Sequence, residues 1–392
     1  MKNIHLILLP LLFACLSCKS QNQKVYKNRV HNKSVEIYSD AVGKEIKQVV
    51  DKYAKKALKD SLINSLSIGL YIDNVSLAFN YGGLTNGKSD LPTNHTIYEI
   101  ASVTKTFTGT LAAKAVLEGK LNLDDDIRKY LPMPYANLEY EQNSIRVKHL
   151  LTHTSGLPGG ILGINEELVS ADFNEIEFNK VFTEQENKQT KSMFFKELSK
   201  IKMIEKPGVK FNYSNVGTNL MGYILEVVYN KPFQELIIDE IVSKNQMVDT
   251  HFNVPVGKKN RLAKGYLLGQ LMPESNLSKT LWGAEGALKS TIFDMLKYIH
   301  YHLKNSEVIK ESHKNIYEID DNYWIGYFWW SIQNQNHDLH YRHDGGISRG
   351  KSRLIIYPER KIGFIVFTNQ SSVKINQKLD DLIYNIYNEL KE

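Results

Sequence analysis

The sequence predicts an α/β (α+β) fold: a mainly antiparallel sheet, built from both chain ends and flanked by helices, with an inserted all-helical lobe. Two strand-like runs, 67–72 and 75–79, lie near the start of the chain. Two more, 353–357 and 362–368, lie near its end and are joined by a short polar segment. Helical spacing of apolar residues dominates from about 120 to 289. Strands at both ends, with helices between them, predict one sheet to which both ends contribute.

The individual elements follow from periodicity and from residues that turn the chain or stop a helix. Asp73-Asn74 predicts a tight turn between the first two strands, and Gly119 ends an amphipathic helix that begins at Thr104. Further elements are expected where the apolar pattern continues: helices at 41–62, 293–303 and 375–390, and a strand at 323–330. Residues 165–192 are acidic and polar, which predicts an excursion over the surface rather than core.

The N-terminus has the features of an export signal. A short basic start precedes an apolar run, 4–12, that is too short to span a bilayer as a permanent helix. The only two cysteines of the chain follow, each directly after a small residue, as at a bacterial lipoprotein cleavage site. Cys18 is the favoured lipid-attachment site because a polar segment follows it at once, and Cys15 is the alternative. An ordinary cleaved signal peptide also fits this run.

We therefore expect a lipoprotein signal peptide at 1–18, a tether at 19–40 and a folded domain at 41–392. The α/β lobe of that domain takes up about 41–105 plus 290–392, and the helical lobe about 106–289. The protein would be exported to the cell envelope and held on a bacterial membrane by its lipid. The net charge is +6, but basic and acidic residues are interleaved and no basic block with aromatics occurs. Nucleic acid is therefore not an expected partner.

The first chemical motif is Ser102-Val103-Thr104-Lys105. A serine hydroxyl is a weak nucleophile unless a base takes its proton, and a lysine three residues on lies on the same face of a helix. Burial lowers the pKa of such a lysine, so that it can act as the base. The pattern Ser-x-x-Lys also occurs at Ser199, Ser348 and Ser371. Ser102 differs from these three because it opens a long helix directly after an apolar lead-in, whereas the others lie in polar, lysine-rich stretches.

Two further motifs follow in the chain. Tyr213-Ser214-Asn215 comes after a Pro-Gly turn signal and before a helical pattern, so that the phenol and the amide can both project from a loop. His343-Asp344-Gly345-Gly346 directly precedes the paired strands near the C-terminus. Adjacent glycines let a substrate backbone approach closely, and they expose an N–H that can complete an oxyanion hole with the N–H of Ser102.

These three motifs, in this order, resemble the penicillin-recognising serine hydrolases. That superfamily includes class C β-lactamases, D-alanyl-D-alanine carboxypeptidases, D-amino-acid peptidases and related esterases. Other segments are similar to the class C-like branch, so that the resemblance runs from about residue 65 to 370: 117–125, 150–157, Pro207-Gly208 and 283–291. The resemblance implies a β-lactamase/transpeptidase-like fold and hydrolysis of an amide or ester through an acyl-enzyme.

The resemblance also implies a role for each motif residue. Ser102 would carry the acyl group, while Lys105 and Tyr213 would share the duties of general base and general acid. The remaining motif residues would bind the substrate or its oxyanion: Asn215 at the substrate amide, His343 on the strand that edges the cleft, and Gly345 and Gly346 beside Ser102. No cofactor and no metal is implied. His149 and His153 are four residues apart, but neither an HExxH pattern nor an acidic third ligand accompanies them.

Departures from the β-lactamase pattern narrow the expected substrate. Asp344 stands where β-lactamases carry a hydroxyl residue, and a carboxylate facing the cleft would repel a β-lactam carboxylate while attracting a free amine. We therefore expect cleavage of D-amino-acid or cell-wall-type peptides, with an esterase, a β-lactamase and a catalytically silent binding module as alternatives. Arg349 and Lys351 are interpreted as solvated strand-end charges, with binding of a substrate carboxylate as the alternative. Glu285 is assigned a structural role.

Overall fold

The computed structural model describes residues 41–160, 172–334 and 337–391, all of which belong to one compact unit. The expected signal peptide, the tether, Cys15 and Cys18 lie outside these residues, so the lipid anchor stays a prediction. Across the described residues, no helix has both the length and the apolar character needed to span a bilayer.

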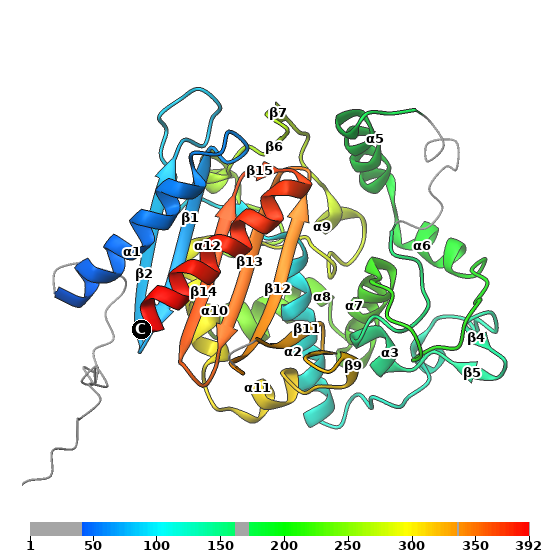
Figure 1. The fold of residues 1–392 in the computed structure, drawn as a ribbon. Helices are drawn as coiled ribbons and strands as arrows, with labels where there is room; N and C mark the ends of the chain where they lie inside the picture. The colour runs from blue at the N-terminus through cyan, green and yellow to red at the C-terminus, as the bar shows by residue number, and fades with distance from the viewer. Residues whose placement is uncertain (1–40, 161–171, 335–336, 392) are drawn as a thin grey trace, which may run out of the picture. The chain divides into compact units, whose positions relative to one another are not determined.

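An eight-stranded sheet forms the centre of the structure (Figure 1). Its strands follow the order β2-β1-β14-β13-β12-β11-β10-β9, and every neighbouring pair is antiparallel. Their bounds are β1 Ser65–Ile72, β2 Val75–Gly82, β9 Tyr317–Asp320, β10 Tyr323–Gly326, β11 Trp329–Gln333, β12 Leu339–Ile347, β13 Gly350–Tyr357 and β14 Ile362–Thr368. Strand β1, from the start of the described chain, pairs with β14, from near its end, with Ser67 opposite Phe367. The prediction that both chain ends build one sheet is therefore confirmed.

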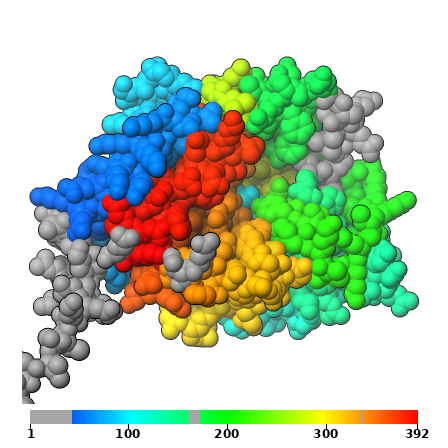
Figure 2. Space-filling model, viewed as in Figure 1, coloured from blue at the N-terminus to red at the C-terminus, as the bar shows by residue number. Residues whose placement is uncertain are grey.

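The sheet separates two apolar cores. Alternate residues of each strand point their side chains into opposite cores, as the two-residue period of a strand requires. One face of β1 and β14 carries Leu66, Ile68, Phe364 and Val366, which join the same apolar cluster as residues of α1 (Ala41–Ala57) and α12 (Val373–Lys391). Figure 1 shows these two helices over this face of the sheet, and Figure 2 shows them side by side at the surface. The opposite face packs on α10 (Ile292–His302) and on the apolar cluster that contains α2 (Thr104–Leu117).

The segment between β2 and α10 supplies most of the remaining helices. The α-helices are α3 Val147–Leu151, α5 Glu175–Lys188, α6 Lys191–Leu198, α7 Asn215–Tyr229, α8 Phe233–Ile237 and α9 Leu277–Thr280, and α11 Glu307–Ser312 follows α10. Short helical turns are η1 Ala101–Val103, η2 Ile127–Tyr130, η3 Ile238–Val242 and η4 Val256–Arg261. Two-residue strands are β3 Tyr98–Glu99, β4 Glu139–Tyr140, β5 Asn143–Ser144, β6 Tyr266–Leu267, β7 Gln270–Leu271, β8 Lys289–Ser290 and β15 Gln370–Ser371.

The run 323–330, predicted as one strand, is two strands joined by a tight turn. Tyr327 and Phe328 both have positive φ, at 50° and 65°, which is the backbone of a two-residue hairpin turn. The aromatic composition concealed this turn because it lacks the Asn or Gly that usually marks one. The turn is held from outside instead: the Phe328 N–H donates to the Leu151 carbonyl at 2.8 Å.

The turn also contacts α2 at Gly109, and glycine is the only residue type that allows this contact. A Cβ on Gly109 would lie 1.8 Å from the Tyr327 carbonyl oxygen, so the helix backbone and the turn backbone meet without a side chain between them. This close approach fixes the position of α2 relative to the sheet. Because α2 follows Ser102 directly, Gly109 helps to set where the nucleophile lies.

We predict that Gly109→Ala lowers the free energy of unfolding by at least about 2 kcal/mol, because either α2 or the turn must move to admit the methyl group. Urea denaturation measures the change. Gly257→Ala is the matched control, since a Cβ there would meet no atom within 4 Å, and it should change stability by less than about 0.5 kcal/mol. Equal stabilities of the two variants would contradict this account of the packing.

Candidate active site

Ser102 lies in the turn η1, directly before α2, rather than within the helix. Between residues 101 and 113 every side chain except that of Ser102 is buried. Helix α2 is therefore buried on all sides near its start, and the predicted single apolar stripe is only part of its packing. Ala101, just before Ser102, has a φ of 48°, a left-handed conformation that is uncommon for residues other than glycine. The backbone thus turns sharply to present one partly exposed hydroxyl from an otherwise buried segment.

Lys105 is fully buried beside this hydroxyl. Its Nζ lies 3.2 Å from Ser102 Oγ. Nζ also donates to Asn215 Oδ1 at 2.7 Å and to the Glu285 backbone carbonyl at 2.6 Å. Burial lowers the pKa of Lys105 to about 7, although the nearby charge of Glu285 opposes this shift. A substantial fraction of Lys105 is therefore uncharged at neutral pH.

Hydrogen bonds of the intervening residue, Ser214, position Tyr213 and Asn215. Between them, Ser214 caps α7, because its Oγ accepts from the Gly217 N–H. The Ser214 N–H donates to Nδ1 of His153, and its Oγ donates to the Pro158 carbonyl. His153 thus fixes the loop by a hydrogen bond. It also packs against the Tyr213 ring, with the ring centroids 4.3 Å apart.

The Tyr213 phenol completes the group around the nucleophile. Burial raises the pKa of Tyr213, and a hydrogen bond with Ser102 offsets part of that rise. Lys105 Nζ lies 4.9 Å from the centroid of the Tyr213 ring. The structure therefore brings together Ser102, Lys105, Tyr213 and Asn215, the four residues singled out by the first two motifs.

Strand β12 carries the third motif past the nucleophile turn. A Cβ on Gly345 would lie 2.3 Å from the Ile100 carbonyl and 2.1 Å from Ser352 Oγ, so only glycine allows this approach. Ser352, opposite Gly345 on β13, donates its hydroxyl to the same Ile100 carbonyl at 2.8 Å. The contact brings the backbone of Gly345 and Gly346 beside the segment that leads into Ser102.

His343, two residues before Gly345, points toward the same face of the strand. Its Nδ1 donates to the Asp344 carbonyl at 2.9 Å, while Nε2 is buried and has no hydrogen-bond partner. Burial and the nearby charge of Lys105 lower the pKa of His343 to about 3. His343 is therefore neutral at physiological pH, and it offers the site an acceptor nitrogen rather than a positive charge.

Asp344 does not share the face of His343, contrary to the orientation considered from the sequence. Its carboxylate accepts from the Arg342 guanidinium at 2.6 Å and lies 3.4 Å from Arg353 Nε. Both arginines also contact Asp380 of α12. Strand alternation accounts for this, because a residue between His343 and Gly345 must point to the opposite face. The argument from Asp344 against β-lactam binding therefore fails, and so does its suggested role in attracting an amine.

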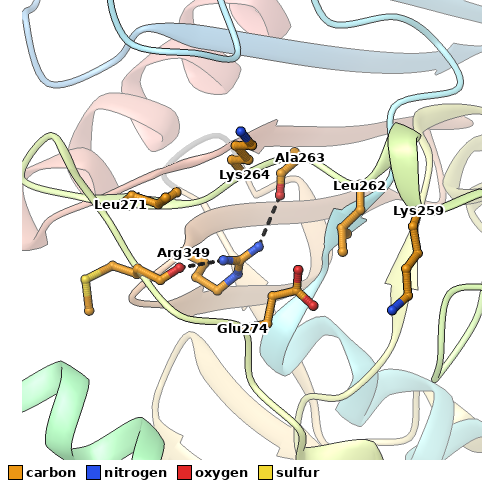
Figure 3. A pocket seen from close by; sticks show the side chains of 8 residues that line it. Lys259, Leu262, Ala263, Lys264, Leu271, Glu274 and Arg349 are labelled. Atoms are coloured by element: carbon orange, nitrogen blue, oxygen red, sulfur yellow. Dashed lines mark hydrogen bonds between the residues drawn. The ribbon is translucent and has the colours of Figure 1, made fainter.

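Arg349 is not a solvated charge either. The Arg349 guanidinium forms a buried ion pair with Glu99 at 2.5 Å, where the two side chains are 5% and 9% exposed. The same guanidinium donates to the Ala263 carbonyl at 3.2 Å, as Figure 3 shows, and to the Met272 carbonyl at 2.7 Å. The surrounding pocket has a volume of about 330 Å³ and is also lined by Lys259, Lys264 and Glu274. Lys351 lies over Gly346, with Nζ 2.7 Å from the position that a Cβ would occupy there.

His149 and His153 have separate structural roles. The Arg146 N–H donates to His149 Nδ1, whereas His153 binds the Ser214 backbone. Among the described residues, no group of three or more His, Cys, Asp or Glu side chains could hold a metal ion.

Two features of the site were missed from the sequence. Glu285 contributes its backbone carbonyl to Lys105, a contact that no side-chain pattern reports. The run Gly283-Ala284-Glu285-Gly286 gave a possible signal, because small residues allow such an approach. The left-handed Ala101 is the second feature, and its residue type gave no signal at all.

Comparisons with known proteins agree with this geometry. The model of the family described as Beta-lactamase matches residues 50–387. Protein flp of Staphylococcus aureus (strain N315) is 29% identical over 353 residues, which cover 87% of this chain and 66% of that protein. The chain thus spans just under two thirds of the length of that relative. A protein described as a β-lactamase from Providencia stuartii is 26% identical over 295 residues, or 72% of this chain and 69% of that one.

Two solved structures share the fold. One is a β-lactamase/D-alanine carboxypeptidase from Yersinia pestis complexed with citrate, with a TM-score of 0.76 and 21% identity over 88% of this chain and 99% of that one. The other is a mutant class C β-lactamase, with a TM-score of 0.74 and 18% identity over 90% of this chain and 100% of that one. At these identities, the likeness concerns the fold alone.

We predict that Arg349→Met lowers the free energy of unfolding by about 3–5 kcal/mol, because it leaves the buried Glu99 carboxylate without its cation. Urea denaturation of the purified protein measures this change. Lys310→Met is the control, since the Lys310–Glu307 pair is exposed and should contribute less than about 1 kcal/mol. A solvated Arg349, as the sequence suggested, would give two equally small effects.

Proposed function

Because the chain belongs to the β-lactamase family, within the superfamily of serine β-lactamases and penicillin-binding-protein-like serine hydrolases, we propose that it cleaves amide bonds of D-amino-acid or cell-wall-type peptides through an acyl-enzyme on Ser102. Family membership supports a serine hydrolase in general. The choice of an amide substrate rests on the chemistry of the residues around Ser102.

The observation that carries the proposal is the hydrogen bonding of Lys105. An uncharged primary amine has two N–H donors and one lone pair. Two acceptors, Asn215 Oδ1 and the Glu285 carbonyl, lie within 2.7 Å of Nζ and use both donors. The lone pair is then left for Ser102 Oγ at 3.2 Å. This arrangement suits a base that takes the Ser102 proton as Oγ attacks the substrate carbonyl.

Tyr213 is assigned the acid step. Its raised pKa keeps the phenol protonated at neutral pH, so that it holds a proton that it can give away. A proton delivered from the phenol to the departing nitrogen lets the amide bond break, and Lys105 then restores the phenol proton. In the second half of the cycle, Lys105 takes a proton from the water that attacks the acyl group, and it gives this proton to Ser102 Oγ, which leaves as a hydroxyl.

Backbone amides supply the oxyanion site in this proposal. The N–H groups of Ser102 and Gly346 would donate to the oxygen that becomes negative during attack. The close contact between Gly345 and Ile100 supports this assignment, because it holds the two backbones together. Asn215 would orient the substrate amide with the part of its side chain that Lys105 does not use.

The neutral His343 of β12 favours amides that lack a carboxylate at this position over β-lactams. β-Lactamases usually carry a lysine where this chain has His343, and His343 is neutral at physiological pH. A β-lactam carboxylate would therefore find no positive charge at that position. An ester leaving group departs more readily than an amide nitrogen, so the same site would also cleave esters, and an esterase is the second candidate.

We expect Ser102→Ala to lower kcat/KM for D-alanyl amide and peptide substrates by at least about 10³-fold, and Lys105→Met by about 10²–10⁴-fold. The substrate panel comprises D-Ala-D-Ala peptides, D-amino-acid amides, short-chain nitrophenyl esters and a chromogenic cephalosporin. Ser199→Ala is the matched control, because Ser199 also begins a Ser-x-x-Lys sequence but is exposed.

Activity that survives Ser102→Ala would contradict the mechanism. Faster cleavage of the cephalosporin or the esters than of every amide would contradict the substrate assignment alone. If a fluorophosphonate fails to label Ser102 in folded protein and no substrate is cleaved, the chain is a binding module.

We also predict that kcat/KM rises with pH through about 7. The base must be uncharged, and Lys105 loses its proton as the pH rises through a pKa of about 7. Below that pH the protonated amine cannot accept the Ser102 proton, so activity falls as the pH decreases. Initial rates on one amide substrate between pH 5 and 9 measure the profile. A rate that does not change between pH 6 and 8 would remove Lys105 from the role of base.

A further inference from the structure

A small cavity next to the Lys105–Asn215 pair has acidic walls. Two carboxyl groups line it, Glu186 of α5 and Glu285, and they come from segments about one hundred residues apart. The rest of the lining is mostly apolar: Gly160, Gln189, Phe194, Val216, Asn219, Leu277 and Leu281. The cavity has a volume of about 20 Å³, which is room for one water-sized group.

The cavity adjoins the site described above on two sides. Glu285 provides the carbonyl that accepts from Lys105, so its side chain starts within the active site. Val216 and Gly160 follow Asn215 and Gly159 in the chain, and the Asn215 N–H donates to the Gly159 carbonyl at 3.2 Å. A substrate amide held by Asn215 would therefore lie next to this cavity.

The two carboxyl groups of the cavity are acceptors, and the nearby charge of Lys105 offsets part of the rise in the pKa of Glu285. Within the described ranges, neither Glu186 nor Glu285 forms an ion pair with Lys, Arg or His at 4 Å or less. Burial and the charge of Glu285 raise the pKa of Glu186 to about 8, and burial also raises the pKa of Glu285. Both carboxyl groups thus lie in surroundings that penalise their negative charge, and a cation in the cavity would relieve that penalty.

Asn219 gives a separate indication of a missing donor. Its side chain is only 2% exposed and lines the cavity, and its amide binds the Glu285 carboxylate. Its Oδ1, however, is buried without a hydrogen-bond partner. A buried amide oxygen without a donor is costly, so an unpaired one beside two carboxyl groups indicates a donor that arrives with a ligand.

These features fit an ammonium group better than other cations. An –NH₃⁺ group carries three N–H donors, and the cavity offers acceptors for all of them: two carboxyl groups and the Asn219 amide oxygen, with the Gln189 side chain also in the lining. It also has the size of one water molecule. Calcium would need six to eight oxygen ligands, and magnesium would keep several waters, which this volume does not hold.

We propose that this cavity binds a primary ammonium group on the acyl part of the substrate, so that the enzyme prefers substrates with a free amine to N-acylated ones. The inference rests on the proposed amide hydrolysis at Ser102 and adds the feature by which the substrate is chosen. In this proposal Glu186 and Glu285 recognise the amine. Asp344, to which the sequence assigned that role, lies on the other face of β12.

The test compares D-alanyl and D-lysyl p-nitroanilides whose amino groups are free or acetylated, one position at a time. For the wild type, we expect kcat/KM to be about 10- to 100-fold higher for the free amine at one of these positions. Glu186→Gln should remove most of that ratio, since the amide keeps the size of the carboxyl group but cannot take up a negative charge beside the ammonium group. Glu184→Gln, on the exposed side of the same helix, should keep the wild-type ratio.

A second measurement does not depend on turnover. Calorimetric titration of Ser102→Ala with the same compounds should show about 10-fold tighter binding of the free amine, and Glu186→Gln in that background should abolish the difference. Equal kcat/KM and equal affinity for free and acetylated compounds, or a ratio that Glu186→Gln leaves unchanged, would overturn the inference. If Ser102→Ala retains turnover, the proposed function fails instead, and the titrations still decide the question of the ammonium group.

Discussion

The structure depends on keeping the amine of Lys105 buried away from solvent. Lys105 is buried where a charged ammonium group is strongly disfavoured, and it is tolerated because its hydrogen bonds suit the uncharged amine. Its partners come from three separate parts of the chain: the turn before α2, the first residue of α7 and the segment that leads into β8. Each of these segments must be in place before the amine has its partners. The catalytic chemistry of Lys105 therefore requires the same arrangement of these segments as their packing does.

Two close backbone approaches hold the nucleophile against this amine. Gly109 lets α2 rest on the Tyr327 turn, and Gly345 lets β12 rest on the Ile100 carbonyl. Between these contacts, Ala101 adopts a left-handed conformation, which costs on the order of 1 kcal/mol for a residue with a Cβ. Strained residues persist where the surroundings determine the backbone, and they gather at functional sites. Here the strain is found directly before Ser102, the one side chain in the segment 101–113 that is not buried.

Much of the fold could be read from the sequence because its signals are local. The Asp73-Asn74 turn, the helix after Ser102 and the paired strands at the C-terminus each follow from periodicity and turn residues. The order of the three motifs also identified Ser102, Lys105, Tyr213 and Asn215, which the structure brings together. What the sequence could not show was orientation. The face of Asp344, the burial of Arg349 and the turn at Tyr327 depend on neighbours distant in the chain. Glu186 lies in the segment 165–192, whose polarity predicted only an excursion over the surface.

The pairing of β1 with β14 has a consequence for how the chain folds. The residues of this pair are about 300 positions apart, so β1 has only β2 as a partner until nearly the whole chain is available. Contacts of such long range slow folding, because the chain entropy is lost before the contact forms. A half-made chain would expose the apolar edge of β1 and the face that α12 later covers. The protein therefore relies on its last thirty residues to bury its first strands, and a nascent chain that lacks them is at its greatest risk of aggregation.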